Sequence, residues 1–332
     1  MVSGSANNPD LDALSAAARW QAEGMGVALS IVMKTWGSSP RPVGSLMVVN
    51  EMGQFAGSVS GGCVEGAVLL DAKKAMVRGQ AVRQSFGISD EEAWAASLAC
   101  GGSMEVLTVR PPSLAPVLDA RVLRIPIALA VRLENGTASI VDDKGQMGTL
   151  DKADLVTARA MLQTGQTGLD GSENLFVLSL LPQPRILIVG ATHIAQVLAA
   201  MAPLAGFDVA IIDPRHAFND PGRFPGVTHS KASPAAALAE LGLDPRSAVV
   251  TLTHQPKIDE EALSLALDSP CFYIGALGSK KTHAARLERL GRGQDRIRGP
   301  VGLDIGAKTA GEIAVSILAE VIEVWRKGST SP

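Results

Sequence analysis

Arg185-Ile-Leu-Ile-Val-Gly190-Ala-Thr-His193-Ile-Ala195 is the stretch that decides the fold of the C-terminal half of this chain. Its first residues are mostly aliphatic or β-branched, which predicts a strand buried in a parallel sheet. A glycine turn and an alanine-rich helical pattern follow, and a second apolar run ends in an acid, Asp213, about 20 residues after Gly190. This order is typical of a βαβ unit that binds a dinucleotide. We therefore predict a Rossmann-like, doubly wound parallel sheet in residues 183–332.

The glycine pattern of this turn departs from the usual Gly-x-Gly-x-x-Gly and reads Gly190-x-Thr192-x-x-Ala195. Alanine fits the third place, which only requires close packing of helix on strand. Threonine at the second place puts a Cβ where the backbone usually approaches phosphate closely. Two interpretations stay open: a nucleotide bound at this turn, or a doubly wound domain that binds no dinucleotide in the usual pose.

Polar or glycine-rich loops follow four predicted strands in this half. Ligands of open α/β sheets bind beyond the carboxyl ends of the strands, so these loops are candidates for one site. Gly278-Ser279-Lys280-Lys281 offers backbone donors, a hydroxyl and two cations, which suit phosphate. His254 and Asp259 can handle a proton or orient a ligand, although a surface position is the simpler interpretation of a single histidine. The four loops are residues 190–193, 213–216, 253–259 and 278–283.

Short strand and helix patterns in residues 1–110 predict an N-terminal α+β domain, which a middle α+β segment at 111–182 continues. Pro182-Gln-Pro184 is the best linker in the chain, so we expect the boundary to the Rossmann-like domain there. The predicted fold class is α/β, with the C-terminal doubly wound sheet preceded by a smaller α+β N-terminal domain.

Two clusters of glycine and cysteine lie in the N-terminal half. Ser60-Gly61-Gly62-Cys63-Val-Glu65 leads into a helical pattern, and such a loop is a ready anion site because free N–H groups and the helix dipole point the same way. A thiol at a helix start has a lowered pKa, which makes Cys63 a candidate thiolate, although a small core residue is an equal alternative. Cys100-Gly-Gly-Ser103 is the second cluster. The two clusters can meet in space, or each can be a turn with a buried thiol.

Composition excludes several classes of protein. The chain has 332 residues, of which 46% are hydrophobic, and this length favours two or three domains with packed cores. A net charge of −3 without a long basic run argues against nucleic acid as the main partner. No apolar stretch approaches the roughly 18 residues of a membrane span, and the polar N-terminus lacks a signal-peptide core, so a cytoplasmic protein is expected. Three scattered cysteines predict neither a disulfide framework nor a zinc site.

Taken together, these motifs resemble the XdhC/CoxI family over nearly the whole chain. The resemblance rests on Gly37-Ser-Ser-Pro40-Arg41-Pro-Val-Gly44, Ser60-Gly-Gly-Cys63-Val-Glu65, Cys100-Gly-Gly102, Gly190-Ala-Thr-His193, Asp213-Pro-Arg215, Thr253-His254, Tyr273-Ile-Gly-Ala-Leu-Gly278-Ser279-Lys280, Gly302-Leu-Asp304-Ile-Gly306 and Glu312-Ile-Ala-Val.

The resemblance implies a factor in the maturation of molybdenum hydroxylases such as xanthine dehydrogenase. Such proteins bind molybdenum cofactor, protect it while a cysteine desulfurase helps to install its sulfido ligand, and deliver it to the apo-enzyme. The cofactor is molybdopterin or its cytidine nucleotide form, and a homodimer is plausible because the ligand is labile. Cys63 is the first candidate for contact with the molybdenum or its sulfur. The other candidate cofactor-binding residues are Arg41, Gly61, Gly62, Glu65, Cys100, Gly190, His193, Asp213, Arg215, His254, Gly278, Ser279 and Lys280.

Two other functions stay open. The Gly190 turn and Asp213 also suit an NAD(P)-dependent oxidoreductase, in which His193, His254 and Lys280 are the candidate acids or bases. A scaffold with degenerate sites is the third possibility. No catalytic residue is assigned firmly.

Overall fold

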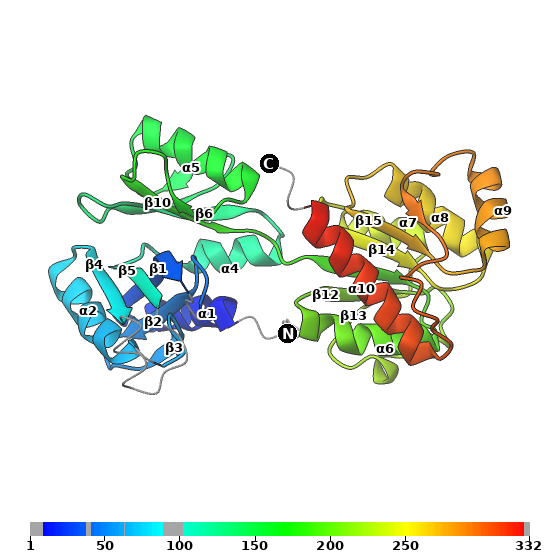
Figure 1. Ribbon diagram of the computed structural model, residues 1–332, viewed down its shortest axis with the longest axis horizontal. Coiled ribbons are helices and arrows are strands. Elements are labelled where there is room, and N and C mark those ends of the chain that lie inside the picture. The colour runs from blue at the N-terminus through cyan, green and yellow to red at the C-terminus, as the bar shows by residue number, and fades with distance from the viewer. Residues whose placement is uncertain (1–8, 38–40, 63, 89–101, 329–332) are drawn as a thin grey trace. The chain divides into compact units, whose positions relative to one another are not determined.

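The computed structural model describes residues 9–37, 41–62, 64–88 and 102–328. Its contacts divide the chain into two compact units, one from Asn8 to Pro182 and the other from Gln183 onward (Figure 1). No helix in the described part of the chain is long and apolar enough to span a membrane.

The N-terminal unit begins with an antiparallel sheet in the order β3-β2-β1-β5-β4. Helix α1 precedes this sheet in the chain, and helix α2 connects β3 to β4. The elements are α1 (Pro9–Ala22), β1 (Val27–Gly37), β2 (Leu46–Asn50), β3 (Phe55–Gly57), α2 (Glu65–Arg78), β4 (Val82–Ile88) and β5 (Gly102–Val109).

A second antiparallel sheet of the same unit has the order β8-β7-β6-β10-β9. Its elements are α4 (Ala115–Val122), β6 (Ile127–Arg132), β7 (Ala138–Val141), β8 (Gln146–Met147), α5 (Lys152–Thr164), β9 (Gly168–Leu169) and β10 (Leu175–Leu180).

Strand periodicity explains how these two sheets share one core. Along β1, Leu29 and Ile31 face a core that also receives α1, α4 and side chains of the second sheet, such as Phe176. The alternate residues Ala28 and Val32 face α2 instead. Helix α5 covers the other face of the second sheet in the same way. The middle segment therefore packs onto the same core as residues 9–110.

The C-terminal unit is a six-stranded parallel sheet in the order β13-β12-β11-β14-β15-β16. Helices α6 and α10 cover one face, and α7, α8 and α9 pack against the other. The predicted doubly wound fold is confirmed. Its elements are β11 (Arg185–Val189), α6 (His193–Met201), β12 (Asp208–Ile212), β13 (Thr228–Ser230), α7 (Pro234–Leu241), β14 (Ser247–Thr251), α8 (Pro256–Leu267), β15 (Tyr273–Ala276), α9 (Lys280–Leu290), β16 (Ile297–Arg298) and α10 (Ala310–Gly328).

A buried carboxylate in α10 ties this helix to the sheet. Glu320 is only 7% exposed, and its Oε2 accepts hydrogen bonds from the Tyr273 hydroxyl at 2.5 Å and from the Gly302 backbone N–H at 2.8 Å. Burial, reinforced by the charge of Glu320, raises the pKa of Tyr273, so the phenol remains an O–H donor. The network fixes the start of the Gly302–Gly306 loop against β15.

Candidate functional site

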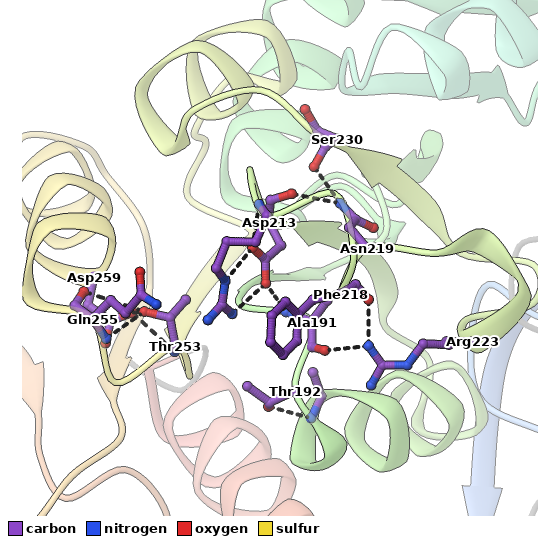
Figure 2. A network of polar contacts seen from close by, with 12 residues as sticks. Ala191, Thr192, Asp213, Phe218, Asn219, Arg223, Ser230, Thr253, Gln255 and Asp259 are labelled. Atoms are coloured by element: carbon purple, nitrogen blue, oxygen red, sulfur yellow. Dashed lines mark hydrogen bonds and ion pairs between the residues drawn. The ribbon is translucent and has the colours of Figure 1, made fainter.

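The four loops predicted to form a site lie at one edge of the C-terminal sheet. They follow β11, β12, β14 and β15, which are parallel to one another and so end on the same side. Strand β12 pairs with one side of β11 and β14 pairs with the other, so the order of the strands reverses at β11. Figure 2 shows residues that follow β11, β12 and β14 gathered at this switch point, where open α/β sheets usually bind their ligands.

The Gly190 turn needs glycine for two reasons. Its φ is +115°, which other residues rarely adopt, and an added Cβ would lie 2.7 Å from Cγ2 and 2.9 Å from the backbone N of Thr253. Thr192, which replaces the second glycine of the usual motif, is the N-cap of α6, and its Oγ1 accepts a hydrogen bond from the Ala195 N–H at 3.3 Å. The departure from the motif therefore supplies a helix cap.

Asp213 is fully buried and uses its whole carboxylate within the protein. Oδ2 accepts from the Ala191 N–H at 2.8 Å and from Arg215 Nη2 at 2.7 Å, while Oδ1 accepts from the backbone N and the Nε of Arg215, both at 2.9 Å. Burial acts to raise the pKa of Asp213, but the hydrogen bonds from Arg215 and Ala191 outweigh it and lower the pKa. The protein's own donors therefore occupy both carboxylate oxygens, and a ribose hydroxyl would have to compete with them. This geometry disfavours the usual dinucleotide pose.

Arg223 is a residue of this edge that the sequence interpretation missed. Its Nη1 donates to the carbonyl oxygens of Ala191, at 2.9 Å, and Phe218, and its Nη2 donates to Oε1 of Gln196 at 3.0 Å. The guanidinium thus joins the Gly190 turn, the first turn of α6 and the 214–226 loop. Figure 2 shows its contacts with Ala191 and Phe218. Nothing in its sequence context marks it except a position in a loop rich in proline and glycine.

Asn219 was also missed, although it is fully buried. Its Nδ2 donates to the carbonyl oxygens of Asp213 at 3.2 Å and Ser230 at 2.7 Å. The side chain therefore holds the segment after β12 against β13. Arg215 lies on the same segment with its guanidinium 4.3 Å from the ring centroid of Phe218, a cation–π contact that orients the cation.

The two predicted histidines of this edge are exposed. His193 begins α6 and its Nδ1 lies 3.3 Å from Oε1 of Gln196. His254 has a left-handed backbone with φ of +59°. Behind it, Oδ1 of the buried Asp259 accepts from the hydroxyl and the N–H of Thr253, at 2.6 and 3.2 Å. Burial raises the pKa of Asp259, and its contacts show a carboxyl that fixes the loop against which Gly190 packs.

The Gly278 loop ends at a capped helix. Ser279 is the N-cap of α9, and its Oγ accepts from the Thr282 N–H at 3.1 Å. Lys280 and Lys281 are exposed in the first turn of α9, so both cations lie at the surface of this edge. The N–H groups at the start of a helix have no acceptor within that helix. The structure thus brings Gly190, His193, Asp213, Arg215, His254, Gly278, Ser279 and Lys280 to the same edge of the sheet.

The predicted anion loop of the N-terminal unit already contains an anion. The carboxylate of Glu65, the first residue of α2, accepts six hydrogen bonds from the loop before it. Their donors are Ser58 Oγ, Ser60 N, Ser60 Oγ, Gly61 N, Gly62 N and Val64 N, at 2.6–3.2 Å. The expectation of free N–H groups at this loop was therefore wrong, because a side chain of the same loop binds them. The positive φ angles of Gly61 and Gly62, +83° and +128°, make the loop conformation possible.

The remaining N-terminal candidates divide into two groups. Arg41 donates to Oδ1 of Asp10 at 2.8 Å, and the same oxygen accepts from the Leu46 N–H at 3.1 Å, so Arg41 helps to attach α1 to β2. Cys63 and Cys100 lie outside the described residues. Among the described residues, no group of three or more His, Cys, Asp or Glu side chains is placed to hold a metal ion.

The hydrogen bonds to Glu65 should make the free energy of unfolding depend on pH. Partial burial acts to raise the pKa of Glu65, but the hydrogen bonds from Ser58 and Ser60 outweigh it and lower the pKa to about 2 from 4.5. The stability that Glu65 contributes is therefore complete above pH 4.5 and is lost as the pH falls toward 2. In urea unfolding, Glu65→Gln should be destabilised by about 1–3 kcal/mol at pH 7 and by progressively less at acid pH. A pH-independent difference would contradict this. Glu51→Gln is the control and should lose less, because Glu51 accepts only one backbone N–H and the glutamine amide oxygen can still accept it.

The comparisons with known proteins agree with this architecture. The model of the XdhC Rossmann domain matches residues 186–321, and that of the XdhC and CoxI family matches residues 20–87. The molybdenum cofactor insertion chaperone PaoD of Escherichia coli K12 is 31% identical over 311 residues, covering 91% of this chain and 84% of that protein. A Bacillus subtilis protein described as a probable subunit of xanthine dehydrogenase is 27% identical over 311 residues, covering 90% of this chain and 93% of that protein.

The fold also matches a crystal structure described as a xanthine dehydrogenase from Bacillus halodurans, with a TM-score of 0.76, 24% identity, and coverage of 96% of this chain and 98% of that one. Fold and site define a protein in which a Rossmann-like domain follows an α+β domain. Asp213, at the position of the acid that binds a ribose in dinucleotide-binding domains, is paired with Arg215 instead. The chain belongs to the XdhC/CoxI family, as its motifs predicted.

Proposed function

We propose that this protein is a maturation factor that binds molybdenum cofactor and inserts it into a molybdenum hydroxylase of the xanthine dehydrogenase type. The observation that carries the proposal is the 31% identity to a molybdenum cofactor insertion chaperone across 91% of the chain. The Rossmann-like edge supports it, because Asp213 is closed to a ribose while cations and helix N-termini remain open to a phosphorylated ligand.

The residues present fit such a cofactor. Its phosphate suits the first turns of α6 and α9, near which His193, Arg215 and Lys280 supply polar or charged groups. When bound, the cofactor supplies a molybdenum centre carrying sulfur, to which a thiolate such as Cys63 is chemically matched. Glu65, Gly61 and Gly62 would then act by fixing the loop that carries this cysteine.

The finer parts of the proposal follow from family membership. They are protection of the cofactor, assistance to its sulfuration by a cysteine desulfurase, a cytoplasmic homodimer, and delivery to the apo-enzyme. Binding of the molybdopterin or the cytidine nucleotide form is compatible with a phosphate-binding edge. We also propose that the chain is organised as an N-terminal α+β domain (1–110), a middle segment that continues it (111–182) and a Rossmann-like domain (183–332).

An NAD(P)-dependent oxidoreductase is the second candidate, because the Gly190 turn and the N-terminus of α6 keep the Rossmann arrangement. The four hydrogen bonds that Asp213 already accepts from Ala191 and Arg215 weigh against it. Titration of the full chain with NAD and NADP separates the two: binding in the micromolar range would favour the oxidoreductase.

The cofactor proposal predicts a selective effect of one thiol. The full chain, purified without oxygen from cells that make molybdenum cofactor, should release a pterin on denaturation, which can be oxidised and measured by fluorescence. Cys63→Ala should reduce the bound pterin on the order of 10-fold, because a soft ligand of the centre is lost. Cys271→Ala is the matched control: this thiol is buried in the core under the Rossmann sheet, and burial raises its pKa, so its loss should leave pterin binding unchanged. Absence of pterin from the wild-type protein would contradict the proposal.

A further inference from the structure

A buried arginine lies behind the Gly278 loop without a complete set of partners. Arg286 is only 4% exposed. Its Nη2 donates to the carbonyl oxygen of Leu277 at 2.8 Å, but its Nη1 is buried and has no hydrogen-bond partner among the described residues. A buried guanidinium with an unmatched N–H is costly, so an acceptor from outside the chain is expected to complete it.

The position of this guanidinium relates it to the start of α9. Arg286 lies on the sheet-facing side of α9, and helical side chains point back toward the helix N-terminus. Its Nη2 lies 3.7 Å from the place that a Cβ of Gly278 would occupy, and Gly278 has φ of +141°. The guanidinium therefore lies next to the Gly278 turn, which leads directly into the first turn of α9. The N–H groups of Lys280 and Lys281 in that turn have no acceptor within the helix.

The charges around Arg286 leave it short of a counterion. Burial lowers the pKa of Arg286, whereas the more distant carboxylates of Asp259 and Glu260 act to raise it. No ion pair joins Arg286 to either acid within the described part of the chain: Oδ1 of Asp259 accepts from Thr253, and Glu260 pairs with Arg289. Within the part of the chain that the structure describes, the hydroxyl of Thr251 is also buried without a partner, and Thr251 shares the sheet face of Val249.

We infer that the first turn of α9 and the Arg286 guanidinium together form an anion subsite that takes a phosphate monoester. One phosphate oxygen accepts from Nη1 of Arg286, and the others accept from the N–H groups of Lys280 and Lys281, with the lysine ammonium groups balancing the charge. The assignment of this phosphate to the pterin cofactor rests on the proposed function. The subsite itself rests on the contacts of Arg286 and the Gly278 turn.

Inorganic phosphate is the probe that tests the subsite alone. Binding to the full chain should be measured by calorimetry against chloride at equal ionic strength, followed by the arginine side-chain signals in ¹H–¹⁵N spectra. We expect the Arg286 signal to shift on titration, and Arg286→Met to weaken binding on the order of 10-fold. Arg289→Met is the matched control, because Arg289 lies on the same helix but is half exposed and paired with Glu260, so its binding should stay within about two-fold of wild type.

The outcomes separate this inference from the proposed function. Phosphate binding that is unchanged in Arg286→Met, or an Arg286 signal that does not respond to phosphate, would overturn the subsite even if pterin copurifies. Phosphate binding that depends on Arg286 in a protein that carries no pterin would support the subsite and contradict the cofactor proposal. Should Arg286→Met fail to fold, Arg286→Lys keeps the charge and loses the fork, and the wild-type titration still decides.

Discussion

Gly190→Ala is expected to lower the free energy of unfolding by about 4 kcal/mol. Two costs add at this position. The backbone has φ of +115°, and the new methyl group would lie 2.7 Å from Cγ2 and 2.9 Å from the backbone N of Thr253. Since Thr253 is fixed by two hydrogen bonds to Asp259, it has little freedom to move away. Urea unfolding followed by circular dichroism measures the loss, and the transition of the C-terminal unit should shift most.

Gly206→Ala separates the two costs. Gly206 has φ of +85°, but an added Cβ would meet nothing within 4 Å, so this variant carries the backbone strain without the clash. We expect it to lose about 1 kcal/mol. Equal losses for the two variants would show that the close approach of Gly190 to Thr253 is not what holds the turn.

The second large effect is expected for Glu320→Ala, which should cost about 3 kcal/mol. Removal of this carboxylate leaves the buried hydroxyl of Tyr273 and the N–H of Gly302 without their acceptor, and each unmatched donor carries its desolvation penalty. Hydrogen exchange at Gly302 and neighbouring amides should rise together with the loss of stability measured in urea.

Glu323→Ala provides the comparison on the same helix. Glu323 is 37% exposed, and its partner is the exposed Lys327, one turn away. Exposed pairs of this kind contribute little, so the expected loss is at most about 0.5 kcal/mol. A loss similar to that of Glu320→Ala would mean that helix propensity, and not the buried network, sets the cost.

Most of the C-terminal fold could be predicted from sequence, because its signals are local. The aliphatic run at 185–189, the glycine after it and the acid at 213 each follow from the needs of a buried parallel strand and its turn. The short edge strands β13 and β16 were not predicted as strands, because two or three residues show no measurable periodicity.

The site was predicted as a set of loops but not as a network. Local patterns place Asp213 and Arg215 after the same strand, yet they do not show that Arg215 occupies the carboxylate which a ribose would need. Arg286 lies in a helix rich in basic residues and looks solvated in sequence, although the sheet-facing side of α9 buries it. Long-range geometry decides both cases. Cys63 and Cys100, which carried the sulfur chemistry of the prediction, lie outside the described residues.

Glu65 and the loop it organises have one more consequence. Donors and acceptor all come from one short run of sequence, Ser58 to Glu65, so the arrangement depends little on distant contacts. We therefore expect the segment to keep its conformation when it is placed ahead of a helix in an unrelated scaffold, because it carries its own acceptor for the loop N–H groups. Because an exchange of Glu65 would leave several backbone N–H groups without their acceptor at once, we expect Glu65 and its donors to tolerate replacement only together.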